Sequence, residues 1–181
     1  MKTPRMLKLY RTKVVPQMMA DFKYKTVMAV PKIEKVVVNI GTGRMVKDAK
    51  FLEKAEKDLQ QLTGQKPSIR KAKKSISGFK LREGTDVGMA VTLRGRRMYD
   101  FIDRLVSIAL PRTRDFRGLN PSSFDKQGSL NIGIKEHNIF PEIKYETLKD
   151  IFGLGLTITT TARSKEEGTA LLRLMGFPIK K

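Results

Sequence analysis

Residues 94–119 read R-G-R-R-M-Y-D-F-I-D-R-L-V-S-I-A-L-P-R-T-R-D-F-R-G-L, and their first half has the spacing of an amphipathic helix. Six apolar side chains recur on one helical face, namely Met98, Phe101, Ile102, Leu105, Val106 and Ala109. Pro111 is expected to end the helix, because its ring disfavours the helical conformation for Leu110 and it has no N–H to donate. The apolar stripe predicts that this helix is packed into a core.

Arginines flank this helix on both sides. Three precede it and three follow it, namely Arg94, Arg96, Arg97, Arg112, Arg114 and Arg117. A guanidinium group can bind two phosphate oxygens at once and can stack on a base. Six of them around one buried helix therefore favour a contact with nucleic acid over a solvated basic surface.

The composition of the whole chain points the same way. Its 181 residues include 37 basic and 18 acidic side chains, for a net charge of +19. A polyanion would neutralise that self-repulsion, so a nucleic acid or an anionic membrane is indicated. The hydrophobic content of 40% predicts a folded core, and the length fits a single domain over residues 1–181.

Membrane and redox functions find no support. No apolar run approaches the roughly 20 residues of a membrane span, and the N-terminus lacks the apolar region of a signal peptide. The chain has no cysteine, which excludes disulfides and thiolate chemistry. We expect a cytoplasmic protein with no membrane partner.

Four segments alternate between apolar and polar or small residues, as half-buried strands do: 33–41, 88–94, 130–134 and 154–162. A shorter strand is possible at 65–69. Asn39 falls on the polar face of the first strand, and Thr92 and Arg94 fall on the polar face of the second.

Helices alternate with these strands. Thr3 and Pro4 are typical of a helix start, and Pro16 is expected to end or kink that helix. Asp48 and Gly64 have the positions of caps for the next helix, and Ser164-x-x-Glu167 is a capping box for the last one. The order predicts an α+β fold whose mainly antiparallel sheet has helices on one face. The other face is left open, either as an ordinary solvated surface or as a platform for the shallow minor groove of RNA.

The longest segment between two strands is a basic arm at 70–87. Residues 66–86 contain seven basic and two acidic side chains. A loop of this length is usually functional or disordered, and such loops are commonly mobile until a partner orders them.

Catalysis finds little support, and we expect no catalytic residue, no metal site and no cofactor. His137 is the only histidine, and it is better interpreted as a surface or hydrogen-bonded residue than as a base. Asp100 and Asp103 on one helix are better interpreted as charge balance for the arginines than as metal ligands. Gly41-Thr42-Gly43 follows a strand, but Val46 stands where a dinucleotide fingerprint needs its third glycine.

Several stretches resemble one family along the whole chain. A-L-P-R-T-R-D-F-R-G-L at 109–119 is similar to the signature of the large-subunit ribosomal protein family numbered five, whose members bind 5S rRNA. The same family is matched by V-P-K-I-E-K-V-V-V-N-I-G-T-G at 30–43, G-I-K-E-H-N-I-F-P-E-I at 133–143 and T-T-T-A-R-S-K-E-E-G at 159–168. The order is preserved, which makes the resemblance more specific than any single motif.

The resemblance implies a structural protein of the large ribosomal subunit, of bacterial type, docked on 5S rRNA in the central protuberance. Three polar residues of its open sheet face would hydrogen-bond this RNA, and the alignment of motifs puts them at Asn39, Gln65 and Thr92. Gln65 rests on the resemblance alone. Arg94, Arg112, Arg114 and Arg117 are the candidates for further rRNA contacts, including large-subunit rRNA.

The arm matches the family's extended loop, which touches peptidyl-site tRNA and lies near the small subunit. The implied tRNA-binding residues are Lys71, Lys73, Lys74 and Lys80. Neighbouring ribosomal proteins, including a bridge partner in the small subunit, are implied as well. Two places depart from the family pattern: residues 122–130 differ from the usual F-D-G-x-G-N-Y, and His137 stands where glutamine is usual. The alternative function is an architectural protein that binds double-stranded nucleic acid without sequence specificity.

Overall fold

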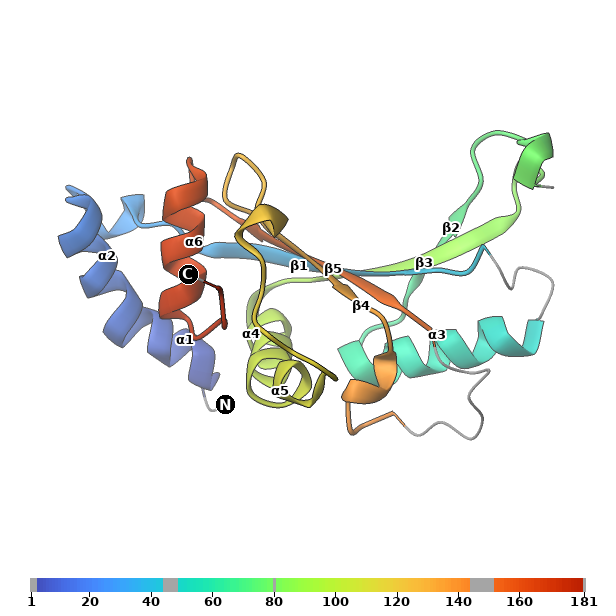
Figure 1. Ribbon diagram of the computed structural model, residues 1–181, viewed down its shortest axis with the longest axis horizontal. Coiled ribbons are helices and arrows are strands. Elements are labelled where there is room, and N and C mark those ends of the chain that lie inside the picture. Colours follow the sequence, from blue (N-terminus) through green and yellow to red (C-terminus); the bar gives the residue numbers. More distant parts are fainter. Residues whose placement is uncertain (1–2, 44–48, 80, 144–151, 181) are drawn as a thin grey trace. The chain divides into compact units, whose positions relative to one another are not determined.

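The computed structural model describes residues 3–43, 49–79, 81–143 and 152–180 (Figure 1). In that part of the chain the helices are α1 Arg5–Leu9, α2 Val15–Phe22, α3 Ala49–Thr63, α4 Gly95–Arg104, α5 Leu110–Arg112 and α6 Lys165–Leu174. The strands are β1 Ile33–Gly41, β2 Ser68–Lys71, β3 Asp86–Leu93, β4 Leu130–Ile134 and β5 Leu154–Thr160. They form one sheet in the order β2-β3-β1-β5-β4. The predicted α+β class with a mainly antiparallel sheet is confirmed.

The chain divides into two compact units. The first comprises Met1–Val36, Leu93–Ile132 and Leu156–Lys181, and the second comprises Val37–Thr92 and Gly133–Gly155. The single domain over residues 1–181 stays a prediction.

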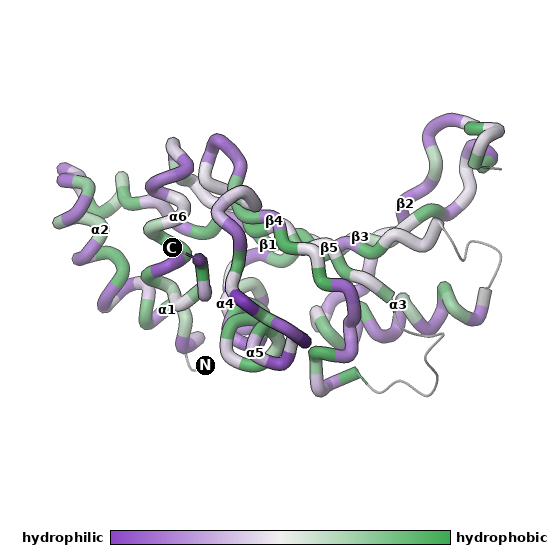
Figure 2. Tube along the Cα trace, in the orientation of Figure 1, coloured by the Kyte–Doolittle hydropathy of each residue, from purple (hydrophilic) through white to green (hydrophobic). Residues whose placement is uncertain are grey.

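In the second unit, α3 supplies the helical side of the core. Ala55, Leu59 and Leu62 of α3 are buried, and so are Val38 and Ile40 of β1 and Met89 and Val91 of β3. Hydrophilic and hydrophobic residues alternate along this helix, as an amphipathic helix requires (Figure 2). Gly64 ends the helix as predicted, with φ +67° and an N–H that donates to the carbonyl of Gln60 at 2.8 Å. The expected cap Asp48 lies outside the described residues.

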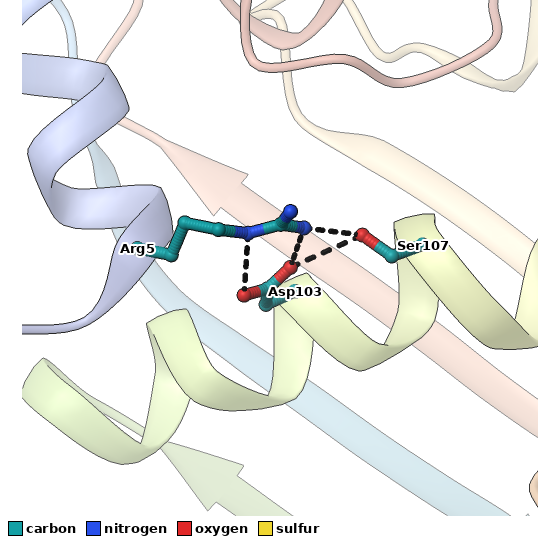
Figure 3. A network of polar contacts seen from close by, with 3 residues as sticks. All are labelled: Arg5, Asp103 and Ser107. Carbon is teal, nitrogen blue, oxygen red and sulfur yellow. Dashed lines mark hydrogen bonds and ion pairs between the residues drawn. The ribbon is translucent and has the colours of Figure 1, made fainter.

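In the first unit, α4 lies at the centre of the core. Met98, Phe101, Ile102 and Leu105 are buried, as the spacing predicts, while Val106 is half-buried. Helix α1 packs against α4. The two helices are joined by a network in which the Arg5 guanidinium binds both carboxylate oxygens of Asp103 and donates to Ser107 Oγ at 2.6 Å (Figure 3). The hydrogen bonds that Arg5 donates to Asp103 also raise the pKa of the Arg5 guanidinium.

The prediction that Pro111 ends the central helix is wrong. Leu110 is helical, with φ −60° and ψ −45°, and the helix continues to Arg112. The reason is a π-helical turn at Leu105–Ala109, in which the Leu110 N–H donates to the carbonyl of Leu105. A π-helical turn contains one extra residue, so the carbonyls before it are shifted relative to the proline ring. The N–H that Pro111 lacks then falls where the regular helical hydrogen bonds are already interrupted.

Pro16 is accommodated in the same way. The turn Tyr10–Val14 is π-helical, the Val15 N–H donates to the carbonyl of Tyr10, and α2 then runs on through Pro16. The helix therefore does not end at Pro16, and a widened turn precedes the proline. The buried residues in this region include Met6, Val14 and Met18, whereas Leu7 and Tyr10 are half-buried.

The arm is a hairpin rather than a loop between strands. β2 and β3 pair antiparallel with Ser68 opposite Ala90, and the pairing shifts at Arg70 and Lys71. Further out, Ala72 exchanges two backbone hydrogen bonds with the segment at 84–85. Ile76 and Leu81 pair again around a 3-10 turn at Ser77–Phe79. The basic arm therefore carries its own ladder of backbone hydrogen bonds.

Candidate nucleic-acid interface

Asn39 lies on the exposed face of β1, as predicted. Its neighbours Val38 and Ile40 are buried, so the alternation of the strand directs the Asn39 amide away from the core. The amide lies across Gly155 on β5, where a Cβ would come within 2.9 Å of Asn39 Nδ2. Because Gly155 has no side chain, the Asn39 amide has room on the surface of the strand.

Thr92 lies on the corresponding face of β3. It is half-buried, while Met89 and Val91 on either side of Ala90 are 5% and 2% exposed. Ala90 shares the face of Thr92 and is nevertheless 8% exposed, so this face is not uniformly open.

Gln65 precedes β2 rather than belonging to it. The predicted strand at 65–69 is found at Ser68–Lys71, three residues later. The Gln65 N–H donates to Thr63 Oγ1 at 3.3 Å, and its carbonyl accepts from the same hydroxyl at 3.0 Å. The backbone of Gln65 is thereby tied to the end of α3, and its side chain is half-buried.

Two candidate RNA-binding residues were missed in the sequence, because β2 begins three residues later than predicted. Ser68 and Arg70 stand opposite Ala90 and Gly88, and residues directly opposite in an antiparallel pair share a face. Both are exposed, and both therefore lie on the face of Thr92. The available signal was Pro67, which cannot donate to a ladder and marks the start of the strand.

The six arginines predicted to flank α4 are all exposed, namely Arg94, Arg96, Arg97, Arg112, Arg114 and Arg117. Arg94 immediately precedes α4, whereas Arg96 and Arg97 lie in its first turn rather than before it, and Arg112 lies in the last turn of α5. Arg96 pairs with Asp100 at 3.6 Å, which confirms the interpretation of that carboxylate as charge balance.

The segment after α5 turns sharply. Thr113 is extended and Asp115 has a left-handed φ of +53°. Arg114 Nε lies 3.9 Å from Asp115 Oδ2, with both side chains almost fully exposed, so the guanidinium remains available to a partner. Arg117 follows the same turn.

On the arm, Lys71, Lys73 and Lys74 are exposed, and Lys80 lies outside the described residues. Lys71 is the last residue of β2, and the other two follow it on the outer part of the hairpin. Apolar side chains accompany them, with Ile76 47% and Phe79 78% exposed.

The loop at 122–130 is closed by Asp125. Asp125 Oδ1 accepts the N–H groups of Gln127 at 3.0 Å and of Ser129 at 2.7 Å. Lys126 and Gln127 are exposed at its tip. The departure from the family pattern therefore falls on a turn with a defined hydrogen-bonded geometry.

His137 lies in the core of the second unit, where it has hydrogen-bond and stacking partners. It is fully buried, and its ring stacks on Phe152 with the centroids 3.9 Å apart. Its Nδ1 accepts the Phe152 N–H at 3.2 Å, and its Nε2 lies 3.9 Å from Asp58 Oδ2. The interpretation of His137 as a hydrogen-bonded residue agrees with this, whereas a surface position does not.

The part of the chain that the structure describes contains neither a metal centre nor a membrane-spanning helix. In residues 3–43, 49–79, 81–143 and 152–180 no three His, Asp or Glu side chains are grouped to hold a metal ion. No helix within the same ranges is both long and apolar enough to cross a bilayer.

A strongly basic α+β chain with a polar strand face, exposed arginines and a lysine-bearing hairpin has the features of an RNA-binding protein. Comparison with known proteins is more specific. Residues 26–82 match the family model described as ribosomal protein L5, and residues 86–179 match the model of the C-terminus of the same ribosomal family. The chain belongs to the ribosomal protein L5 family. The family consists of structural ribosomal proteins, so the chain is not an enzyme, and its place is the ribosome in the cytoplasm.

Curated relatives are similar over nearly the full chain. The large ribosomal subunit protein uL5 of Geotalea uraniireducens is 53% identical over 176 residues, covering 97% of this chain and 98% of the relative. The protein of the same name from a Marinomonas species is 52% identical over 177 residues, covering 98% and 99%. That of Acholeplasma laidlawii is 53% identical over 173 residues, covering 96% of each. The resemblance inferred from the sequence is confirmed.

Proposed function

We propose that the protein is a structural constituent of the large ribosomal subunit that binds 5S rRNA through the polar strand face of its second unit. The names of its bacterial relatives support the assignment to the large ribosomal subunit. The observation that carries the 5S rRNA contact is the exposure of Asn39 on a strand whose alternate residues are buried.

The chemistry of this face suits RNA. A carboxamide offers both a donor and an acceptor, and a threonine hydroxyl offers both as well. Asn39 and Thr92 stand on strands, so their positions are fixed before binding, which reduces the entropy lost on complex formation. Gln65 is included in the site because of the family resemblance, with its backbone held by Thr63.

The arginines supply a second kind of contact. Arg94, Arg112, Arg114 and Arg117 are exposed around a helix whose inner face is buried, and we assign them to phosphates of 5S or large-subunit rRNA. Phosphate contacts position a protein on RNA and make its affinity depend on salt.

We assign the arm to peptidyl-site tRNA. Lys71, Lys73 and Lys74 are exposed on the hairpin, and Lys80 belongs to the same segment. Contacts with neighbouring ribosomal proteins, including a small-subunit bridge partner, are part of the proposal because they follow from the resemblance.

The test is a ratio of affinities. The dissociation constants of the purified protein for 5S rRNA and for an unrelated RNA duplex of equal length should be measured at the same salt concentration. Specific recognition predicts a ratio of about a thousandfold or more, which is the low end for specific protein–DNA complexes. An architectural protein that binds by charge alone would give a ratio near unity. Footprinting on total rRNA would then identify the nucleotides protected.

A further inference from the structure

A second exposed feature, in the first unit, is the short turn formed by residues 25–29. Its three-residue 3-10 helix Val27–Ala29 has no buried residue. Met28 is 96% exposed and Val27 is 58% exposed. Two adjacent apolar side chains are therefore exposed together on one short turn.

The turn is held by its own hydrogen bonds and by the buried segment that follows it. The Ala29 N–H donates to the Thr26 carbonyl at 3.1 Å, and the Val30 N–H donates to the Val27 carbonyl at 3.3 Å. Val30 and Pro31 beyond it are buried, and Tyr10 Oη donates to the Pro31 carbonyl at 3.1 Å. The apolar side chains are thus presented to solvent by a backbone that is fixed in the core.

The connections on either side are equally well ordered. Two hydrogen bonds join Lys32 to Thr161. The Lys32 N–H donates to Thr161 Oγ1 at 3.0 Å, and the Thr161 N–H donates to the Lys32 carbonyl at 2.9 Å. Before the turn, the rings of Phe22 and Tyr24 stack with their centroids 5.9 Å apart. A partner would therefore bind a preformed projection.

Charge identifies the kind of partner. Lys23, Lys25 and Lys32 are exposed beside the turn, and no acidic residue occurs between positions 22 and 33, although Asp21 and Glu34 lie just outside. Lysine is depleted at protein–protein interfaces, whereas interfaces with nucleic acid are strongly positive. Apolar side chains flanked by cations are the means by which proteins place a wedge against base steps in a minor groove.

We propose that the turn at 25–29 is an additional RNA contact, in which Met28 lies against exposed bases of 5S rRNA while Lys23, Lys25 and Lys32 face its phosphates. This inference rests on the proposed function, since it names the same RNA. One methionine on a three-residue turn buries too little area to recruit a separate RNA. It adds instead to the affinity for an RNA that the protein already binds.

The test uses the full chain, purified 5S rRNA and a titration of salt. Met28→Ala should weaken binding about tenfold, in line with partial burial of a methionine side chain. The slope of log affinity against log salt should not change, because no phosphate contact is removed. Met28→Leu, which keeps an apolar side chain of similar size, should bind like the wild type.

Two further variants separate apolar contact from charge and from general surface effects. Met28→Lys adds a cation but removes the apolar group, and it should bind more weakly than the wild type. Phe79→Ala removes an exposed apolar side chain from the arm and should leave 5S rRNA affinity unchanged.

Unchanged affinity of Met28→Ala, or tighter binding by Met28→Lys, would overturn the inference. So would a fall in melting temperature that parallels the fall in affinity, because Met28 would then serve the fold. Failure of the proposed function looks different: the wild type itself would bind 5S rRNA no better than an unrelated duplex, and both assignments would fall together.

Discussion

The strand face around Asn39 and the arm hairpin belong to the same unit of the molecule but present opposite kinds of surface. Asn39 and Thr92 are uncharged and stand on strands in which their immediate neighbours are buried. The arm presents Lys71, Lys73 and Lys74 on a hairpin whose large apolar side chains Ile76 and Phe79 remain exposed. The first surface is suited to recognising the shape of one RNA, and the second to attracting a phosphate backbone.

Removing a buried side chain from the core of this unit should have the largest effect. Leu59 on α3 is 1% exposed, so Leu59→Ala should lower the free energy of unfolding by about 2–5 kcal/mol through lost burial and a cavity. Phe79→Ala on the arm, where the side chain is 78% exposed, is the matched control and should change stability very little. Urea denaturation of both variants measures the difference. Equal losses would mean that the arm is part of the core.

Asn39→Ala should act on binding and leave the fold unaffected. The affinity for 5S rRNA should fall by about 1–3 kcal/mol, because a polar group of the RNA is left without its partner. The melting temperature should stay within the error of the wild type, since the side chain is exposed. A mutant that loses stability together with affinity would show that the amide serves the sheet.

Replacing one of the arginines that follow α4 should have a smaller, electrostatic effect on RNA binding. Arg112→Gln or Arg114→Gln should reduce the slope of log affinity against log salt by about one, as expected for a lost phosphate contact. Arg96→Gln is a useful control, because this arginine already pairs with Asp100 at 3.6 Å. An unchanged slope accompanied by lower stability would assign the substituted arginine to the fold.

The parts of the fold that follow from periodicity were predictable. The buried alternation of β1, β4 and β5 and the inner face of α4 all follow from the spacing of their apolar residues. The two π-helical turns were not predictable, because a proline inside an apolar helical pattern ordinarily means a helix end. Nothing local in the sequence marks the extra residue that accommodates Pro16 and Pro111.

The candidate site was predictable to a similar degree. Asn39 and Thr92 could be placed because each stands in a regular strand. Ser68 and Arg70 were missed because β2 is short and exposed along its length, so it has no apolar alternation to detect. The burial of His137 depends on Phe152, which is 15 residues away in sequence, and local patterns do not carry such contacts.

The division between strand face and arm is tested most directly by trimming the hairpin. Ala72 and the segment at 84–85 form two backbone hydrogen bonds, so residues 73–83 can be replaced by two glycines without breaking the paired base of the hairpin. Deletion of residues 71–82 with a short glycine linker is the coarser version of the same change. The trimmed protein lacks Lys73, Lys74 and Lys80.

The measurement is the affinity of the trimmed protein for free 5S rRNA, paired with tRNA occupancy of the peptidyl site on reconstituted ribosomes. We expect 5S rRNA affinity and folding close to those of the wild type, ribosomes that still assemble, and reduced tRNA occupancy. Loss of 5S rRNA affinity by a trimmed protein that remains folded would contradict it, because the arm would then belong to the surface that binds 5S rRNA.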